Sequence, residues 1–297
     1  MINESMKGKV VVVTGANSGM GKIIATDLAK KGCTLIMVCR IREKPNVALN
    51  EVSGKSKNPN IELMTTDLSS QKEIRDLANK IKEKYPTIDI LINNAGCMSF
   101  GYEETEDNIE RTFATNHLAY FLLTNLLLDN LKNSKEARII NVSSEASKSA
   151  KINFEDLNLK KDYSTFKAYA QSKLANILFT YELTRRLPSN MKVNCVHPGN
   201  VPNTKLGQGS NIFKKYIETI PQHLILTPEE GADTTIWLAS SDEAKEITGK
   251  YLYKRQPIQS NSLSHDVEIA KRLWEVSEEL TKLKDNGKTT NQLNNHF

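Results

Sequence analysis

The fold is decided by residues 9–21, which read KVVVVTGANSGMG. The β-branched run at residues 9–14 has no polar alternation, as expected of a strand buried on both faces. A glycine-rich turn follows at once, and an amphipathic stretch begins near residue 23. In this order the backbone N–H groups of the turn and the positive end of the helix can hold a pyrophosphate. Such a turn also occurs without a ligand, so other motifs in the chain are needed to indicate whether this one binds a pyrophosphate.

Strand-like runs alternate with helix-period segments along the rest of the chain. The runs lie at residues 34–38, 61–65, 88–92, 138–142, 192–196 and 251–253. A charged stretch at 71–85 predicts a helix, and Thr227-Pro228-Glu229-Glu230 predicts the capped start of another. The alternation predicts right-handed βαβ units in an α/β fold. We expect a single Rossmann-type, doubly wound parallel sheet of about seven strands with helices on both faces.

Length and composition favour one domain. A chain of 297 residues could hold two domains, but no proline- or serine-rich linker and no internal repeat divides it. We expect one domain over residues 1–285 and a polar tail over 286–297. The net charge of +5 contains no run of like charges, which argues against a nucleic-acid partner.

Other classes of protein are also disfavoured. The richest apolar stretch, residues 118–128, is too short for a membrane span, and the amino terminus has no signal-peptide pattern. The four cysteines lie far apart, without metal-ligand spacing, and no His/Asp/Glu cluster is apparent. We therefore expect a cytoplasmic protein with no disulfide framework, no membrane span and no metal.

The glycine turn has the pattern T-G-x-x-x-G-x-G, one residue longer in its first spacer than the usual dinucleotide fingerprint. With this pattern the chain resembles the short-chain dehydrogenase/reductase family. The resemblance continues in order through Asn93-Asn94-Ala95-Gly96, Tyr169-x-x-x-Lys173 and Pro198-Gly199, and covers about residues 7–285. Residues 116–118, the spacer 144–169, and residues 172–179 and 272–277 are similar to the retinol-dehydrogenase-like branch, which reduces aldehydes and ketones with NADPH.

The resemblance implies where a dinucleotide cofactor would bind. The glycine turn would hold the pyrophosphate through Gly15, Asn17, Ser18, Gly19, Met20 and Gly21. Asp67 and Leu68 would face the adenine, Asn94, Ala95 and Gly96 the adenosine, and Pro198, Gly199 and Val201 the nicotinamide. Asp67 could also cap the helix that begins near Gln71.

Arg40 distinguishes between the two nicotinamide cofactors. An enzyme that uses NAD places an acid about 20 residues past the turn, to hold the ribose hydroxyls. Here the second strand ends in Cys39-Arg40, with Arg42 and Lys44 beyond. A guanidinium can bind a 2′-phosphate through charge-assisted bonds, so we expect NADP, with NADPH as the reductant. The alternative is a solvated loop charge.

Tyr169 and Lys173 are the expected catalytic pair. They lie four residues apart in a helix predicted to end before Pro188, so both side chains point to one side. Tyrosine has an ordinary pKa of about 10, which a neighbouring ammonium and the positive nicotinamide would lower. The resemblance makes Tyr169 the acid in carbonyl reduction and the base in alcohol oxidation, while Lys173 also holds the nicotinamide ribose.

Two further positions match the catalytic residues of the family. The N-x-S-S pattern at 141–144 assigns the contact with the substrate oxygen to Ser144, with Ser143 as the fallback. A strand-end serine could instead cap the next turn, a role that suits Ser143. Asn116 matches the residue that kinks its helix and holds a water near the lysine. We expect His117 to be structural and His197 to be a positioning residue.

The substrate is less well specified. Asn203 stands where the family usually has Ser or Thr, and residues 203–226 are expected to form a lid over the substrate. The leading hypothesis is an NADP(H)-dependent oxidoreductase acting on a small-molecule carbonyl or alcohol, such as a lipophilic aldehyde or ketone. The alternatives are a catalytically idle NADP-binding sensor and a light-dependent tetrapyrrole reductase-like enzyme. The resemblance also implies a homo-oligomer, and the lack of an anchor argues against a membrane-embedded retinoid.

Overall fold

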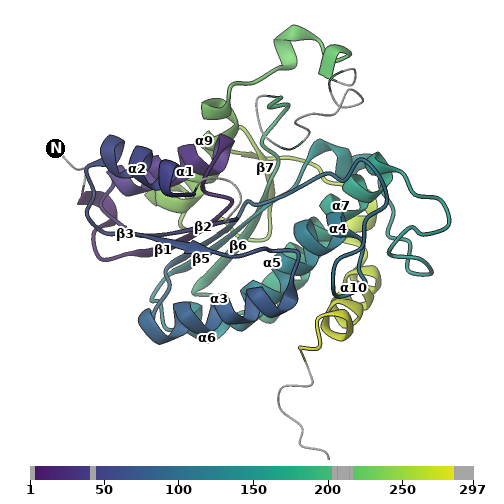
Figure 1. Ribbon diagram of the computed structural model, residues 1–297, viewed down its shortest axis with the longest axis horizontal. Helices are drawn as coiled ribbons and strands as arrows, with labels where there is room; N and C mark the ends of the chain where they lie inside the picture. Colours follow the sequence, from purple (N-terminus) through teal and green to yellow (C-terminus); the bar gives the residue numbers. More distant parts are fainter. Residues whose placement is uncertain (1–3, 41–44, 203–205, 207–213, 215–216, 284–297) are drawn as a thin grey trace, which may run out of the picture.

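A sheet of eight strands lies between two layers of helices (Figure 1). The computed structural model describes residues 4–40, 45–202, 206, 214 and 217–283. Its strands are β1 Val10–Thr14, β2 Thr34–Cys39, β3 Ile61–Thr65, β4 Ile90–Asn93, β5 Ala137–Val142, β6 Met191–Val196, β7 Tyr251–Tyr253 and β8 Gln256–Pro257. The predicted fold class, a Rossmann-type α/β sheet, is confirmed.

The strand order is β3-β2-β1-β4-β5-β6-β7-β8. All neighbouring strands pair in parallel except β7 and β8. In the register, Val11 stands opposite Leu35 of β2 and Ile90 of β4. The chain therefore passes from one side of β1 to the other between β3 and β4. Such a reversal opens a crevice at the carboxyl ends of the strands, where ligands bind.

The strand β8 was not predicted from the sequence. It has two residues, one of them a proline, and it pairs antiparallel with β7 at the edge of the sheet. A two-residue strand has no periodicity to detect. Proline has no N–H to donate, and it is tolerated at the edge of a sheet because no further strand needs that hydrogen bond. The seven predicted strands are confirmed, with ends that shift by at most two residues.

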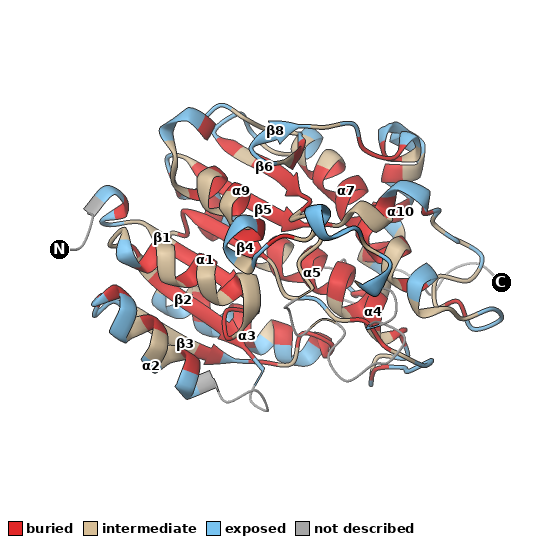
Figure 2. Cartoon of the chain, turned by 90° about the horizontal axis from the view of Figure 1, so that it is seen from above, coloured by how far each residue is buried: buried red, intermediate tan, exposed pale blue. Residues whose placement is uncertain are grey.

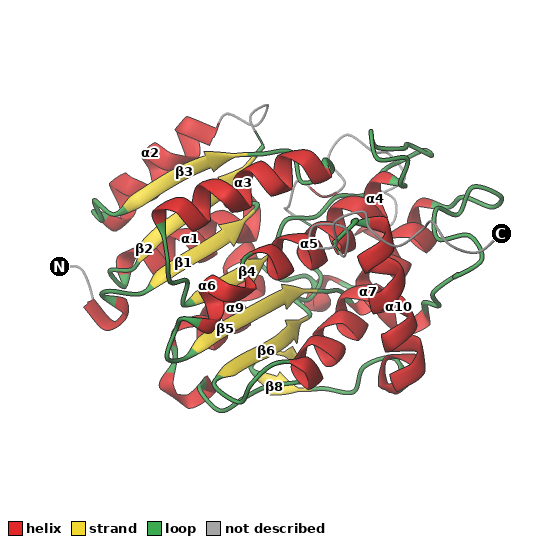
Figure 3. Ribbon diagram, turned by 90° about the horizontal axis from the view of Figure 1, so that it is seen from below, coloured by secondary structure: helices red, strands yellow, loops and turns green. Residues whose placement is uncertain are grey.

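Helices cover both faces of the sheet (Figures 1 and 3). One face carries α1 Gly19–Lys30, α2 Pro45–Ser56 and α9 Pro228–Ser240. The other carries α3 Gln71–Lys84, α5 Ala119–Leu126, α6 Leu128–Lys132, α7 Thr165–Arg186 and α10 Val267–Leu280. In β1, Val11 and Val13 pack towards the first layer and Val12 towards the second, and all three are buried. Figure 2 colours the strands of the central sheet mostly as buried. The apolar run of β1 is thus explained by burial on both faces.

Two predicted helix starts have different outcomes. Thr227 caps α9 as predicted: its hydroxyl accepts from the Glu230 N–H, and the Glu230 carboxylate accepts from the Thr227 N–H. The alternative that Asp67 caps α3 is wrong. Ser70 is the cap, with its hydroxyl accepting from the Glu73 N–H. The Asp67 carboxylate instead accepts from the N–H and hydroxyl of Ser69.

The segment around Asn116 is not a regular α-helix. The short helix α4 Arg111–Phe113 leads into a π-helical turn over Ala114–Leu118, and α5 follows. The N–H of Ala119 donates to the oxygen of Ala114, five residues back. A π-turn fits one extra residue into the helix and displaces the side chains near it. The expected distortion at Asn116 is therefore a π-turn.

Within the described residues, no helix combines the length and apolar character needed to cross a membrane. The predicted end of the domain at residue 285 and the tail 286–297 lie outside those residues, as do Arg42 and Lys44.

Candidate active site

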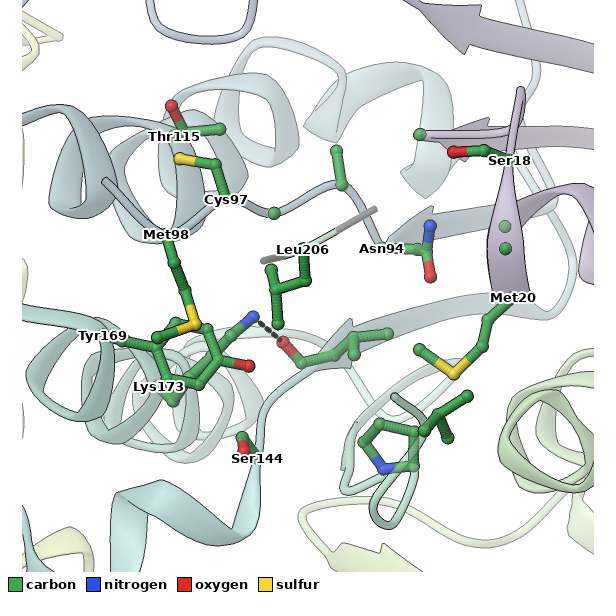
Figure 4. Close-up of a pocket in the computed structure, with 18 of the residues that line it drawn as sticks. Ser18, Met20, Asn94, Cys97, Met98, Thr115, Ser144, Tyr169, Lys173 and Leu206 are labelled. Atoms are coloured by element: carbon green, nitrogen blue, oxygen red, sulfur yellow. Dashed lines mark hydrogen bonds between the residues drawn. The ribbon is translucent and has the colours of Figure 1, made fainter. Parts of the chain in front are cut away.

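A cavity of about 440 Å³ opens where β1 and β4 end. It is bounded by the glycine turn on one side and by α7 on the other. Figure 4 shows Tyr169, Lys173 and Ser144 towards one end, and Ser18 and Met20 towards the other. Its wall includes all the predicted site residues except Asp67 and Asn116: Gly15, Asn17, Ser18, Gly19, Met20, Gly21, Arg40, Leu68, Asn94, Ala95, Gly96, Ser144, Tyr169, Lys173, Pro198, Gly199 and Val201.

The glycine turn is shaped by close backbone contacts. Gly15 has a positive φ of +68°, a backbone conformation that residues other than glycine rarely adopt. A Cβ on Gly21 would lie 2.1 Å from the oxygen of Gly15. Thr14 ties the turn to the end of β4, since its hydroxyl accepts from the N–H of Asn94 at 2.9 Å. The turn therefore has a fixed position against β4.

The first turn of α1 is suited to an anion. The helix begins at Gly19, and the side chain of its N-cap Ser18 makes no capping hydrogen bond. No acidic residue lies in that first turn. By contrast, the side chain of Ser70 caps the N-terminus of α3, and that of Thr227 caps the N-terminus of α9. Uncapped N–H groups and the positive end of a helix fit the pyrophosphate of a dinucleotide.

Arg40 and Asp67 interact electrostatically at one end of the cavity. Burial alone would raise the pKa of Asp67, but hydrogen bonds from Ser69 and the charges of Arg40 and Arg111 hold it below its usual value. Asp67 is therefore an anion, bonded to Ser69 and not part of the cavity wall. Arg40 does line the cavity, and its positive charge fits an anionic group there.

Tyr169 and Lys173 come from the same side of α7, as predicted. The Lys173 Nζ lies 5.6 Å from the centre of the Tyr169 ring. It donates to the oxygen of Val142 at 3.0 Å (Figure 4), at the end of β5. Burial lowers the pKa of Lys173 to about 8, so its ammonium is readily deprotonated compared with an exposed lysine. This is the kind of perturbed group that gathers in active sites.

Ser143 and Ser144 both face the cavity but differ in their hydrogen bonds. The buried Ser143 hydroxyl donates to the oxygen of Lys173 at 2.7 Å. The Ser144 hydroxyl accepts from the N–H of Ala146 at 3.3 Å and caps the 3-10 turn Glu145–Ser149 (η4). Ser144, and not Ser143, is therefore the capping serine. Its bond uses a lone pair and leaves the hydroxyl proton available to a substrate oxygen.

Asn116 lies behind the cavity wall and is fully buried. Its oxygen accepts from the N–H of Cys97 at 2.8 Å, and its amide nitrogen donates to the oxygen of Cys97 and to the Ser172 hydroxyl, each at 3.0 Å. Both amide protons are thus used. Asn116 connects the segment after Gly96 to α7, the helix that carries Tyr169 and Lys173.

His117 packs in the interior beside Asn116. Its Nε2 lies 2.9 Å from the Ser277 hydroxyl on α10, and burial lowers its pKa to about 4. The ring is therefore neutral near neutral pH and joins two helices.

Sequence reasoning missed several residues of the cavity wall. They are Cys97, Met98, Ser99, Phe100, Glu103, Arg111, Thr115 and Phe166, with Leu206, Ile217 and Ile220 from the expected lid. The spacing could have indicated Phe166, because it lies one helical turn before Tyr169. The loop that carries Met98 has no such periodicity. In the lid, residues 203–205, 207–213 and 215–216 lie outside the described residues.

Cys97 is not an activated nucleophile. Burial raises the pKa of its thiol to about 11, so the thiol is protonated near neutral pH. Among the described residues, no three His, Cys, Asp or Glu side chains are grouped as metal ligands would be.

Known proteins share this sequence and fold. The sequence model of the short chain dehydrogenase family matches residues 9–214. Retinol dehydrogenase 13 of Homo sapiens is 43% identical over 286 residues, which cover 94% of this chain and 86% of the relative. A solved structure of an uncharacterised Mycobacterium paratuberculosis protein has 34% identity and a TM-score of 0.74, covering 93% and 94% of the two chains. A short chain dehydrogenase of Escherichia coli CFT073, complexed with NADPH, shares the fold at 22% identity and a TM-score of 0.67, covering 86% and 99%.

The chain therefore belongs to the short-chain dehydrogenase/reductase family, whose members are oxidoreductases that bind a nicotinamide cofactor and act on alcohols and carbonyl groups. Within that family it is retinol-dehydrogenase-like, as the sequence motifs predict.

Proposed function

We propose that the protein transfers a hydride between NADP(H) and an aldehyde, ketone or the corresponding alcohol. The observation that carries this proposal is a single cavity lined by both a glycine turn suited to a pyrophosphate and the side chains of Ser144, Tyr169 and Lys173. A carbonyl bound between these side chains would lie in the same crevice as the cofactor.

The three side chains have distinct roles in the proposed reaction. Ser144 donates its hydroxyl proton to the carbonyl oxygen and orients the substrate. Tyr169 gives its phenolic proton to the oxygen as negative charge develops there, and takes a proton back in alcohol oxidation. Lys173, with its ammonium 5.6 Å from the ring centre, favours the phenolate form of Tyr169.

The cofactor supplies the hydride, and Arg40 favours its phosphorylated form. The guanidinium lines the cavity beyond the end of β2 and would bind the 2′-phosphate, while the first turn of α1 would bind the pyrophosphate. The roles of Asp67 and Leu68 towards the adenine, of Asn94, Ala95 and Gly96 towards the adenosine, and of Pro198, Gly199 and Val201 towards the nicotinamide stay predictions.

The substrate end of the cavity suits a lipophilic carbonyl compound. Met98 and Phe166 line the wall near Tyr169, and Leu206, Ile217 and Ile220 add apolar surface from the expected lid. Apolar walls with few polar groups bind apolar ligands and orient them at the polar end. The name of the retinol dehydrogenase relative points to the same class of substrate.

Tyr169→Phe tests the proposed chemistry. The variant keeps the aromatic ring in place but has no phenolic proton to transfer. We expect carbonyl reduction to fall at least about a hundredfold, in line with the usual contribution of a general acid, with NADPH affinity unchanged. The rate is measured as NADPH oxidation and the affinity as quenching of protein fluorescence. Equal turnover in the variant would contradict the role of Tyr169. Tight NADPH binding without turnover by the unsubstituted protein would favour the idle sensor.

A further inference from the structure

His197 lies between two loops that line the active-site cavity. It follows β6 directly, and its Nδ1 accepts a hydrogen bond from the N–H of Gly199 at 3.2 Å. On the other side of the ring, Nε2 lies 3.0 Å from a carboxylate oxygen of Glu145. The side chain is buried and stacks on Tyr253 with ring centres 4.8 Å apart. A single imidazole thus contacts both loops.

The two contacts determine the form of the ring. The N–H of Gly199 can only donate, so Nδ1 must carry a lone pair. The proton of the neutral ring is then on Nε2, where it is donated to Glu145. Burial lowers the pKa of His197 to about 4, the charge of Glu145 opposes this shift, and Lys148 adds to it. The ring is therefore neutral near neutral pH, and a second proton would set two N–H groups against each other.

Both contacts end at parts of the proposed reaction site. Glu145 follows Ser144 and is the first residue of η4, the turn that Ser144 caps. Gly199 lines the cavity with a positive φ of +85°, and a Cβ there would lie 2.4 Å from the Leu226 side chain. Strands β5 and β6 pair as far as Val142 and Val196, and beyond this pairing His197 contacts both the Ser144 turn and the loop at Gly199.

We propose that His197 is a positioning residue: its neutral ring, protonated on Nε2, joins the Ser144 turn to the loop at Gly199. It thereby fixes the spacing between the hydroxyl that orients the carbonyl and the loop expected to face the nicotinamide. This inference rests on the proposed function. Hydride transfer depends steeply on such spacing, because small displacements of the reacting groups lower the rate.

Two substitutions separate the contacts. In His197→Asn the amide oxygen stands near the place of Nδ1 and can accept from Gly199, but the contact with Glu145 is lost. In His197→Gln the amide nitrogen stands near the place of Nε2 and can donate to Glu145, but the contact with Gly199 is lost. His265, an exposed residue that does not line this cavity, receives the same two changes as a control.

Each variant is expected to change one parameter and leave the other unchanged. His197→Gln should weaken NADPH binding about fivefold, the loss typical of one hydrogen bond, and keep kcat at saturating cofactor. His197→Asn should keep NADPH affinity and lower kcat about fivefold. Both His265 variants should match the unsubstituted protein. Parallel changes in both parameters, or a lowered Tm with neither parameter changed, would show a purely structural role and overturn the proposal.

Nitrogen NMR of the imidazole gives a test that needs neither turnover nor a variant. Near neutral pH it should show Nε2 protonated and Nδ1 unprotonated, and a proton on Nδ1 would overturn the proposal. If the protein binds NADPH but reduces no carbonyl compound, the proposed function fails. The split in NADPH affinity between the two variants and the NMR result still decide the role of His197.

Discussion

Ser143 and Ser144 show how hydrogen bonds separate the roles of neighbouring residues. The Ser143 proton is donated to the oxygen of Lys173, so it helps to hold α7 against β5. The Ser144 hydroxyl accepts from a backbone N–H and retains its own proton. The sequence pattern assigns the contact with the substrate oxygen to Ser144 and leaves Ser143 as the fallback, because spacing does not determine where a hydroxyl proton is directed.

Replacement of Arg40 should change the choice of cofactor. Arg40→Ala removes the guanidinium proposed to bind the 2′-phosphate, whose charge-assisted bonds are stronger than neutral ones. We expect NADPH binding to weaken by about tenfold to a hundredfold, with little change for NADH. Isothermal titration with each cofactor measures the ratio, and the exposed Arg272→Ala serves as control. An equal loss for both cofactors would contradict a phosphate-specific role.

The buried Lys173 should make stability depend on pH. Its pKa of about 8 in the folded protein lies below the ordinary 10.5. Below pH 8 both states are protonated, and burial of the charge destabilises the folded state. Between pH 8 and 10.5 only the unfolded chain keeps the proton, so this penalty is relieved and the protein becomes more stable.

Lys173→Met lacks this dependence. The free energy of unfolding of the unsubstituted protein should therefore rise by about 3 kcal/mol relative to that of the variant as the pH increases across that range. Urea unfolding of the cofactor-free proteins measures it, with the exposed Lys151→Met as control. Parallel curves of stability against pH for Lys173→Met and the unsubstituted protein would show that Lys173 has the same pKa in the folded and unfolded states.

The glycine turn between β1 and α1 depends on a backbone contact that no other residue permits. A Cβ at position 21 would lie 2.1 Å from the Gly15 oxygen and 2.5 Å from the Asn94 amide nitrogen. Gly21→Ala must therefore displace the turn from β4. We expect a loss of about 2 kcal/mol in the free energy of unfolding and at least tenfold weaker NADPH binding.

Gly54→Ala is a matched control in α2. A Cβ at position 54 has no neighbour within 4 Å, so this change should stabilise the helix by about 0.5–1 kcal/mol. Urea unfolding and NADPH titration measure both variants. If Gly21→Ala behaves like Gly54→Ala, the turn is not constrained as described.

Elements differ in how far the sequence predicts them. Long apolar runs such as Val10–Thr14 are predicted well, because burial on both faces leaves a clear pattern. The capping box at Thr227 is also local and was predicted. β8 and the cap of α3 were not predicted correctly. β8 is too short for a pattern, and Asp67, Ser69 and Ser70 are all plausible caps until the backbone shows which hydroxyl faces the helix.

The crossover of the chain from β3 to β4 brings the parts of the candidate site together. It places the turn after β1 beside the loop after β4, and α7 delivers Tyr169 and Lys173 to the same crevice. The sequence predicts this arrangement because the other motifs follow the ends of β1, β4, β5 and β6, and Tyr169-x-x-x-Lys173 lies on the helix between β5 and β6. It does not predict that Met98 and Leu206 add apolar surface to the wall, because this depends on how loops fold over the crevice.

The proposed activity is the exchange of a hydride between NADP(H) and a carbonyl or alcohol. It is tested by measuring the oxidation of NADPH and of NADH with a panel of aldehydes, ketones and quinones of increasing apolar size. We expect reduction of aldehydes or ketones with NADPH, a preference for lipophilic members, and at least about tenfold lower kcat/KM for NADH as the varied substrate, owing to the lost 2′-phosphate contact. Equal or better use of NADH, or no turnover of any carbonyl compound despite tight NADPH binding, would contradict it.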